Sequence, residues 1–475
     1  MNLDNLTIKK ARELLDRKEI SALQLTNLYL KKIDELNPDL NACLFINKEE
    51  AIKKAQAADL RLSRGETNYL LGIPYLAKDI LMTKGIKTTA GSKILKDYIA
   101  PYNAYVIEKL DKAGAILLGK TNLDEFAHGS STENSYFGPT KNPLDTSLVP
   151  GGSSGGSSAA RAANMCLFSL GSDTGGSIRQ PASFCGLVGL KPSYGLVSRY
   201  GLIAMTSSTD VIGPFTKTAL DSAYVLSTIA GYDKRDANSL NIKEVDYVKN
   251  INKQSIKGLR VGWLKQYFDD NLDKRIKEKI KKLADLLEKS GAKIIPIDLK
   301  YAKYNVPVYY IITPSEISSN LARFDGLSWG LKSSEATNIK EFYKKNRGLG
   351  FGSETKRRIM LGTFCLSAGY SDRYYKLAQK ARKLIKIDYD KAFSKVDVIM
   401  SPTSPHTAFK LNEQIKDPIA MYKEDVYLSG VSLAGLPAIS IKAGLVDNMP
   451  VGCQLIANTK REDLILSVAN FLENN

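Results

Sequence analysis

Histidine is the scarcest catalytic residue type in this sequence. The 475 residues include only two histidines, His128 and His406, against 67 lysines and arginines. Any mechanism that uses an imidazole as general base therefore depends on one of these two positions. A serine nucleophile that uses neither of them needs another base, and lysine is the natural candidate.

Cysteines are few and scattered along the chain. The five residues form no C-x-x-C pair; they are Cys43, Cys166, Cys185, Cys365 and Cys453. This pattern predicts neither disulfides nor a zinc site. It also favours a reducing, cytoplasmic location.

Long apolar runs are missing as well. No run reaches the roughly 18 residues that a membrane-spanning helix needs, so no membrane contact is expected. Residues 1–19 carry charges throughout and lack the apolar core of a signal peptide. With 43% hydrophobic and 25% charged residues, the composition is typical of a soluble globular protein.

The net charge of +17 has two interpretations. It could attract an acidic partner such as RNA, or it could reflect lysines spread over solvated faces. The basic residues are dispersed and form no arginine-rich or aromatic-interleaved block, which favours the second interpretation.

The apolar periodicity changes along the chain. Two amphipathic helices are expected within residues 6–36, with Asn37-Pro38 ending the second, and a third within 48–64. Strands are predicted at 71–77, 115–118, 259–264, 293–297, 396–400, 438–443 and 451–456, and helices at 104–113, 272–290, within 311–391 and at 461–472. This alternation predicts an α/β fold, with a helical N-terminal segment over 1–64 packed on a single large domain over 65–475.

Two copies of Gly-Gly-Ser flank the central part of the chain. They end at Ser153 and Ser177, and a small-residue stretch of helical character and an apolar run lie between them. Paired glycine turns let main-chain N–H groups gather around one point. We interpret Ser177 as a nucleophile, Ser153 as its proton relay and the second turn as an oxyanion hole.

Three other interpretations of these motifs compete with this one. The first is a P-loop, because residues 114–121 (GAILLGKT) match G-x-x-x-x-G-K-[ST]. The middle of this match is apolar and predicts a strand, whereas a P-loop needs free amides that curl around phosphate. Nucleotide binding is therefore disfavoured.

The second and third alternatives concern residues 151–155 (GGSSG), which fit the nucleophile elbow G-x-S-x-G. An elbow on Ser153 could use His406, but it should follow a strand directly, and residues 145–150 are turn-like. A flexible linker is the third alternative. Neither an elbow nor a linker explains why the Gly-Gly-Ser turn is repeated after an apolar core segment.

The longer motifs resemble the amidase signature family. They cover most of the chain from about residue 65 onward and comprise residues 151–157 (GGSSGGS), 171–182 (GSDTGGSIRQPA), 186–192 (GLVGLKP), 198–201 (SRYG), 212–214 (IGP) and 433–437 (LAGLP). Residues 307–326 and 356–362 further resemble the A subunits of glutamyl-tRNA(Gln) and aspartyl-tRNA(Asn) amidotransferases. The sequence departs from the family pattern at Ser158, Arg161, Leu196, Thr209 and Val211, but none of these is a catalytic position.

The resemblance implies a central mixed β-sheet covered by helices and a Ser177–cis-Ser153–Lys78 triad. It also implies an oxyanion hole from the amides of Thr174, Gly175, Gly176 and Ser177. Lys78 follows the apolar run 73–77, where burial is expected, although without the resemblance a surface lysine at a strand end would be the simpler interpretation. To act as a base near neutrality, its pKa must fall by roughly three units, which costs about 4 kcal/mol.

The resemblance also implies a glutamine pocket. Arg358 would bind the α-carboxylate, Asp425 the α-ammonium, and Tyr309 would line the pocket. The register is open by one residue at the adjacent pairs Tyr309/Tyr310 and Arg357/Arg358.

The implied function is that of a glutaminase component. Glutamine would form a glutamyl-Ser177 enzyme, and the ammonia would pass to the B and C subunits of the amidotransferase. These would convert Glu-tRNA(Gln), with Asp-tRNA(Asn) as a second candidate, to the amide form. No metal or nucleotide site is expected in this chain, so ATP, Mg²⁺ and most tRNA contacts are assigned to the partner. A free-standing amidase for another small amide is the main alternative.

Overall fold

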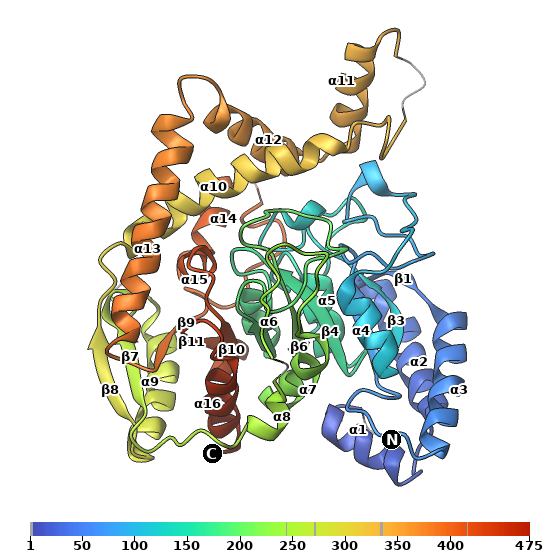
Figure 1. Cartoon of the computed structure of the whole chain (residues 1–475), viewed down its shortest axis with the longest axis vertical. Coiled ribbons are helices and arrows are strands. Elements are labelled where there is room, and N and C mark those ends of the chain that lie inside the picture. The colour runs from blue at the N-terminus through green and yellow to red at the C-terminus, as the bar shows by residue number, and fades with distance from the viewer. Residues whose placement is uncertain (1–2, 244, 270–271, 333–335, 416) are drawn as a thin grey trace.

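One large mixed β-sheet organises the computed structural model, which describes residues 3–243, 245–269, 272–332, 336–415 and 417–475 (Figure 1). The described residues form an eleven-stranded sheet in the order β1-β3-β2-β4-β6-β5-β10-β11-β9-β7-β8. The strands are β1 (Cys43–Ile46), β2 (Pro74–Lys78), β3 (Ile116–Thr121), β4 (Phe168–Asp173), β5 (Val188–Lys191), β6 (Val211–Thr216), β7 (Arg260–Leu264), β8 (Lys293–Ile297), β9 (Val398–Pro402), β10 (Ala438–Val446) and β11 (Met449–Ala457).

Parallel and antiparallel pairings both occur in this sheet. Strand β2 pairs in parallel with β3 and β4, and β7 with β8 and β9, whereas the pairings among β4, β6, β5, β10, β11 and β9 are antiparallel. This confirms the expected α/β class and the mixed sheet.

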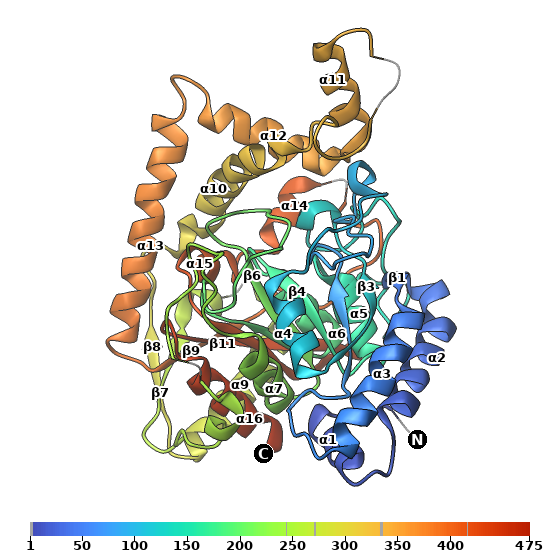
Figure 2. The same cartoon turned by 45° about the vertical axis from the view of Figure 1, so that its right-hand side comes forward.

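Helices surround the sheet (Figures 1 and 2). They are α1 (Ile8–Asp16), α2 (Ala22–Leu40), α3 (Lys48–Ser63), α4 (Tyr105–Ala113), α5 (Gly155–Ala162), α6 (Arg179–Cys185), α7 (Ala219–Ile229), α8 (Tyr247–Asn250), α9 (Lys274–Lys289), α10 (Asn305–Asn320), α11 (Ile339–Gly350), α12 (Ser353–Leu366), α13 (Leu377–Phe393), α14 (Pro418–Lys423), α15 (Ser429–Leu433) and α16 (Glu462–Asn474). Short helical turns lie at η1 (Lys93–Leu95), η2 (Glu125–Ala127), η3 (Lys265–Tyr267), η4 (Ala302–Tyr304), η5 (Leu321–Arg323) and the π-helical η6 (Asp372–Lys376). No helix within the described ranges has the length and apolarity that crossing a bilayer requires.

The N-terminal segment contributes more than helices. The sequence patterns did not predict strand β1, which pairs antiparallel with β3. The expected end of α2 at Asn37-Pro38 is also wrong, because the helix continues to Leu40 and Asn41 caps it in the left-handed conformation. Proline removes only its own N–H donor, and the Asn41 N–H again reaches the Asn37 carbonyl at 2.8 Å. The boundary at residue 64 stays a prediction.

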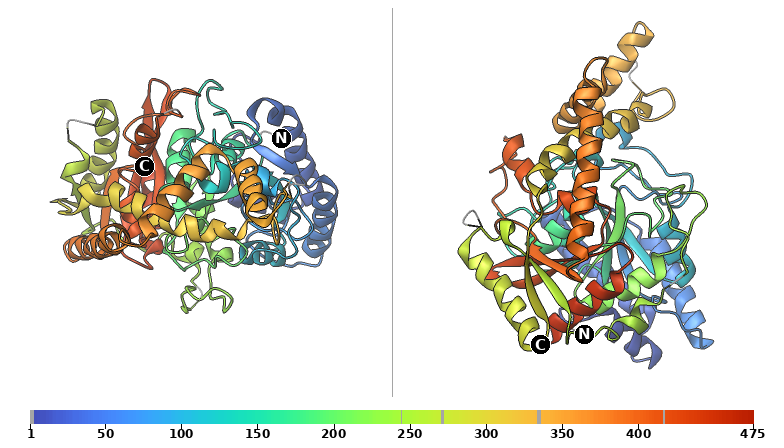
Figure 3. Two further views of the ribbon diagram at one scale, coloured as in Figure 1. Left: turned by 90° about the horizontal axis from the view of Figure 1, so that it is seen from above. Right: turned by 60° about the vertical axis from the view of Figure 1, so that its left-hand side comes forward.

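The stretch within residues 311–391 is mostly helical, as expected. Helices α10, α12 and α13 form a frame above the sheet, and α11 projects beyond it (Figures 1 and 3). Helix α12 lies directly on α10, since a Cβ on Gly362 would overlap the Pro314 carbonyl. This frame carries Tyr309 and Arg358, two of the three residues predicted to bind glutamine, whereas Asp425 follows α14.

The sheet topology brings the two predicted halves of the catalytic centre together. Strands β2 and β4 are parallel neighbours, with Ala77 opposite Leu170. Because parallel strands end at the same edge of a sheet, Lys78 at the end of β2 lies beside the end of β4. The second Gly-Gly-Ser turn follows β4 directly.

Candidate active site

Lys78 is completely buried at the end of β2, so the surface-lysine interpretation is wrong. Its Nζ donates hydrogen bonds to Ser153 Oγ at 2.8 Å, to Ser154 Oγ at 2.8 Å and to Ser172 Oγ at 2.9 Å. These hydroxyls come from the first Gly-Gly-Ser turn and from β4. Among the described residues, three neutral hydroxyl groups and no carboxylate lie within hydrogen-bonding distance of the amine.

This environment favours the neutral amine. Burial lowers the pKa of Lys78 from 10.5 to about 7, although the more distant carboxylates Asp124, Asp210 and Asp173 act to raise it. The shift agrees with the roughly three units expected from the sequence. Near pH 7 about half of the molecules then carry an amine that can accept a proton.

The first Gly-Gly-Ser turn is fixed from several sides. Its Gly152–Ser153 peptide bond is cis, as the family resemblance implies. The Gly152 N–H donates to Gln180 Oε1 at 3.0 Å, and the Ser153 carbonyl accepts from the Asp124 N–H at 3.2 Å. The hydroxyl of Ser153 is thereby held against Lys78.

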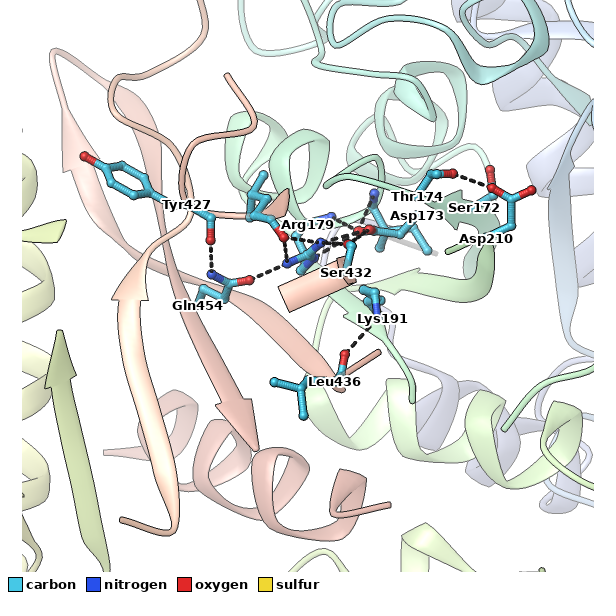
Figure 4. A network of polar contacts seen from close by, with 12 residues as sticks. Ser172, Asp173, Thr174, Arg179, Lys191, Asp210, Tyr427, Ser432, Leu436 and Gln454 are labelled. Atoms are coloured by element: carbon cyan, nitrogen blue, oxygen red, sulfur yellow. Dashed lines mark hydrogen bonds and ion pairs between the residues drawn. The ribbon is translucent and has the colours of Figure 1, made fainter. Parts of the chain in front are cut away.

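The second turn is anchored by a buried ion pair just before it. Asp173 accepts from Arg179 Nε at 3.0 Å and from Arg179 Nη2 at 2.9 Å, and Arg179 also donates to Gln454, Ser432 and the Leu428 carbonyl (Figure 4). Burial acts to raise the pKa of Asp173, but the Arg179 charge outweighs it and the pKa is lowered. This network joins the turn to β11 and α15.

The amides of the turn are available to a ligand. Within the described chain, the main-chain N–H groups of residues 174–177 donate no hydrogen bond. The Thr174 hydroxyl donates to Asp210 at 2.7 Å, and Gly176 has a φ of +150°, which favours glycine. An oxyanion hole needs main-chain N–H groups that are free to donate, and this tight turn supplies four of them.

Ser177 lies at the end of this turn and is partly exposed, whereas Lys78 and Ser153 are buried. The structure joins Lys78 to Ser153 by a hydrogen bond, but among the described residues no hydrogen bond joins the Ser177 hydroxyl to either of them. The relay between Ser153 and Ser177 therefore stays a prediction.

The predicted glutamine-binding residues gather beside the second turn. Arg358 on α12 is buried, donates to Glu354 Oε1 at 2.8 Å and lies 5.4 Å from the Tyr310 ring centroid. Asp425 accepts from the Tyr310 hydroxyl at 2.7 Å. Burial raises the pKa of Asp425 to about 7.

The structure gives different surroundings to the two members of each adjacent pair, Tyr309/Tyr310 and Arg357/Arg358, between which the sequence could not choose. Arg357 points to the surface and pairs with Glu354, while its neighbour Arg358 is buried. Tyr309 contacts the second turn, because a Cβ on Gly175 would lie 2.5 Å from the Tyr309 hydroxyl oxygen. Tyr310 instead holds Asp425, a contact that only the helical register of α10 reveals.

The two rival motifs do not form the sites that their patterns suggest. Lys120 of the P-loop match is buried in β3, donates to the Leu81 carbonyl at 2.7 Å and pairs with Asp79 at 3.2 Å. His406, the base of the elbow interpretation, binds Glu424 Oε1 at 2.7 Å rather than Ser153. In the part of the chain that the structure describes, no cluster of three or more His, Cys, Asp or Glu residues could hold a metal ion.

Comparison with known proteins identifies the family. A family model described as Amidase matches residues 24–466. The A subunit of the glutamyl-tRNA(Gln) amidotransferase of Thermoanaerobacter pseudethanolicus is 53% identical over 473 residues, covering 100% of this chain and 97% of that protein. The corresponding protein of Coxiella burnetii is 52% identical over 464 residues, covering 98% and 96%.

Solved structures agree with these matches. The crystal structure of the A subunit of glutamyl-tRNA(Gln) amidotransferase from Thermotoga maritima superposes with a TM-score of 0.84 at 40% identity, covering 100% of this chain and 96% of that chain. The peptide amidase of Stenotrophomonas maltophilia superposes with a TM-score of 0.84 at 28% identity, covering 99% and 96%. Motifs, fold and full-length similarity lead to one conclusion: the chain is a member of the amidase family.

Proposed function

We propose that this chain is the glutaminase component of a tRNA-dependent amidotransferase. The observation that carries the proposal is that the buried Arg358 and Asp425 both contact Tyr310, whose neighbour Tyr309 lies against the second Gly-Gly-Ser turn. A cation and a carboxylate in one pocket match the zwitterionic head of a free amino acid. A simple aliphatic amide carries neither charge and would form no ion pair with them. The relatives named as amidotransferase A subunits support the same function.

The proposed chemistry starts from Lys78, whose pKa of about 7 and hydrogen bond to Ser153 support its role as the base. Neutral Lys78 accepts a proton from Ser153, which in turn accepts one from Ser177 as its oxygen attacks the side-chain amide of glutamine. The amides of residues 174–177 stabilise the tetrahedral oxyanion. The carbon–nitrogen bond then breaks, and the relayed proton leaves with nitrogen as ammonia. Water hydrolyses the glutamyl-Ser177 ester, which releases glutamate and restores the serine.

The ammonia product implies an acceptor reaction elsewhere. In this proposal, the B and C subunits use ATP and Mg²⁺ to activate and amidate Glu-tRNA(Gln), with Asp-tRNA(Asn) as a second substrate, and they make most of the tRNA contacts. All five cysteines are free and buried, which fits a reducing cytoplasmic compartment.

Ammonia release by the chain bound to its partner subunits tests the proposal. Glutamine should be hydrolysed in preference to asparagine and to simple aliphatic amides, and Ser177→Ala should abolish the activity. His406→Ala serves as the matched control and should keep it, because His406 contacts Glu424 and not the serines. Comparable hydrolysis of varied amides without preference for glutamine would instead identify a free-standing amidase.

A further inference from the structure

One short segment connects the first Gly-Gly-Ser turn with the helix that carries Arg358. It spans residues 124–128 and lies shortly after β3. Its first residue binds the turn, because the Asp124 N–H donates to the Ser153 carbonyl at 3.2 Å. The next side chain, that of Glu125, reaches the start of α12, which leads to Arg358. Two consecutive residues therefore contact the two parts of the proposed active site.

The Glu125 carboxylate binds the start of α12 and is itself buried, with 3% of its surface exposed. It accepts the N–H of Gly352, the residue before the helix, at 2.8 Å. The hydroxyls of Ser92 and Thr355 donate to the same carboxylate. A Cβ on Gly352 would lie 2.7 Å from Glu125 Oε2, so the two groups pack closely. A carboxylate at this end of a helix is also favoured by the helix dipole.

His128, the second histidine of the chain, supports this contact. It is completely buried, and its Nδ1 lies 3.0 Å from the Thr355 hydroxyl oxygen. Burial and the Arg358 charge hold the pKa of His128 well below 6.5, so the ring is neutral at pH 7. Thr355 on α12 is thus bound by Glu125 and His128, two side chains of the same segment.

The backbone of the segment is a rigid connection. Phe126 and Ala127 have φ angles of +49° and +64°, a left-handed conformation that costs energy for residues other than glycine. Such a conformation persists where surrounding contacts fix it, and it occurs often at functional sites. Here the Phe126 ring lies 5.1 Å from the Phe324 ring and 5.7 Å from that of Phe351, which directly precedes Gly352. The segment is therefore held at both ends and in the middle.

Arg358 follows the start of α12 because both belong to one helix. Thr355 and Arg358 are three residues apart, so they lie on the same face, and both are buried. A shift of the first turn of α12 is therefore passed on to the Arg358 guanidinium. In the proposed reaction this group binds the α-carboxylate of glutamine while Ser177 attacks its side-chain amide. The distance between Arg358 and the serines then has to match the length of the substrate.

We infer that Glu125 is a positioning residue that selects the length of the amino-acid amide. Asparagine carries the same reacting and charged groups as glutamine but is shorter by one methylene, roughly 1.5 Å. A misplacement of about 1 Å can cost about 10²-fold in rate. A carboxylate that fixes α12 against the catalytic turn can therefore separate the two substrates. The inference rests on the proposed function and adds to it the residue behind its preference for glutamine.

Hydrolysis of glutamine and asparagine by the chain bound to its partner subunits provides the test. In Glu125→Ala, kcat/KM for glutamine should fall about 10²-fold, and its ratio to kcat/KM for asparagine should fall at least about tenfold. Glu125→Gln should largely restore the ratio, since its side-chain oxygen can still accept the Gly352 N–H. Glu462→Ala is the matched control, because Glu462 is a buried carboxylate that accepts the Ser193 N–H at 2.7 Å at the start of α16. This control should leave the ratio unchanged.

The reactivity of Ser177 separates positioning from general damage. Methanesulfonyl fluoride, a small reagent without a carboxylate, sulfonylates an activated serine and releases fluoride. It should modify Ser177 at the same rate in the native chain and in Glu125→Ala. Thr355→Val, a nearly isosteric change on α12, should lower the ratio as well and decides the question if Glu125→Ala does not fold.

An unchanged ratio in folded Glu125→Ala or Thr355→Val would overturn the inference. Equal losses of Ser177 modification and glutamine hydrolysis would overturn it too, because Glu125 would then support the fold of the catalytic turn as a whole. Absence of any glutamine preference in the native chain would refute the proposed function, whereas a native preference that survives in the variants refutes this inference alone.

Discussion

Replacing Lys78 by methionine should abolish glutamine hydrolysis and at the same time stabilise the protein. Methionine has a similar length and fills the same buried space, but it can neither accept a proton nor carry a charge. The native residue performs chemistry at the expense of stability, because burial lowers its pKa from 10.5 to about 7. Activity and stability should therefore change in opposite directions.

The magnitude follows from this pKa shift. Lowering the pKa of Lys78 from 10.5 to about 7 destabilises the folded protein by about 5 kcal/mol at pH values where the amine is protonated in both the folded and the unfolded chain. Methionine removes this cost but leaves three buried hydroxyls, Ser153, Ser154 and Ser172, without their donor, at about 1 kcal/mol each. The variant should thus be more stable by about 2 kcal/mol at pH 6.

The dependence on pH makes the prediction specific. Between pH 7 and 10.5 the unfolded chain binds a proton that folded Lys78 does not, so native stability rises with pH across this window. From about pH 6 to about pH 8.5 the native protein should gain about 2 kcal/mol from this group. The methionine variant lacks this gain, while all other titrations cancel in the comparison.

Urea unfolding of both proteins at the two pH values, together with ammonia release from glutamine, provides the assay. Lys191→Met is the matched control, because burial also lowers the pKa of Lys191 to about 7, yet its Nζ donates to the Leu436 carbonyl and not to Ser153. This control should show a similar pH-dependent difference in stability and keep its glutaminase activity. Full activity in Lys78→Met, or a stability difference that does not change with pH, would refute the assignment of Lys78 as the base.

Three further predictions concern the pocket and the oxyanion hole. Arg358→Lys keeps the charge but loses the planar fork, so the KM for glutamine should rise about tenfold or more with a smaller change in kcat; an unchanged KM would exclude contact with the carboxylate. Burial raises the pKa of Asp425 to about 7, so its ionised form appears as the pH rises through 7. The KM should therefore fall between about pH 6 and pH 8, and a persisting pH dependence in Asp425→Asn would point to another group. Gly176→Ala would place a Cβ against Leu428 and disturb the amides, so ammonia release should fall by about 10²–10³, whereas Gly348→Ala, with open space around it, should retain activity. Equal rates in these two variants would argue against the oxyanion hole.

Local patterns in the sequence were sufficient to predict many of the helices and strands. Strand β8 occupies its predicted residues, 293–297, and the helical frame spans 305–393, slightly more than the predicted 311–391. Strands β1, β4, β5 and β6 were not predicted, because they are short or interrupted by polar residues, glycine or proline and become strands only through pairing with neighbours. Side-chain periodicity reports one-sided burial, whereas these strands depend on partners far away in the sequence.

The sequence by itself determined the residue types of the site and their order: two glycine turns, each ending in serine, and a lysine after an apolar run. Only the tertiary structure decided what these groups can do. Lys78 meets Ser153 and Ser172 across 75 and 94 residues of chain, and the low pKa exists because segments that remote exclude water from the amine. Likewise, the choice between Tyr309 and Tyr310 depends on which face of α10 meets the turn and which meets Asp425. Burial and electrostatic fields are sums over the whole fold, so no local pattern could have supplied them.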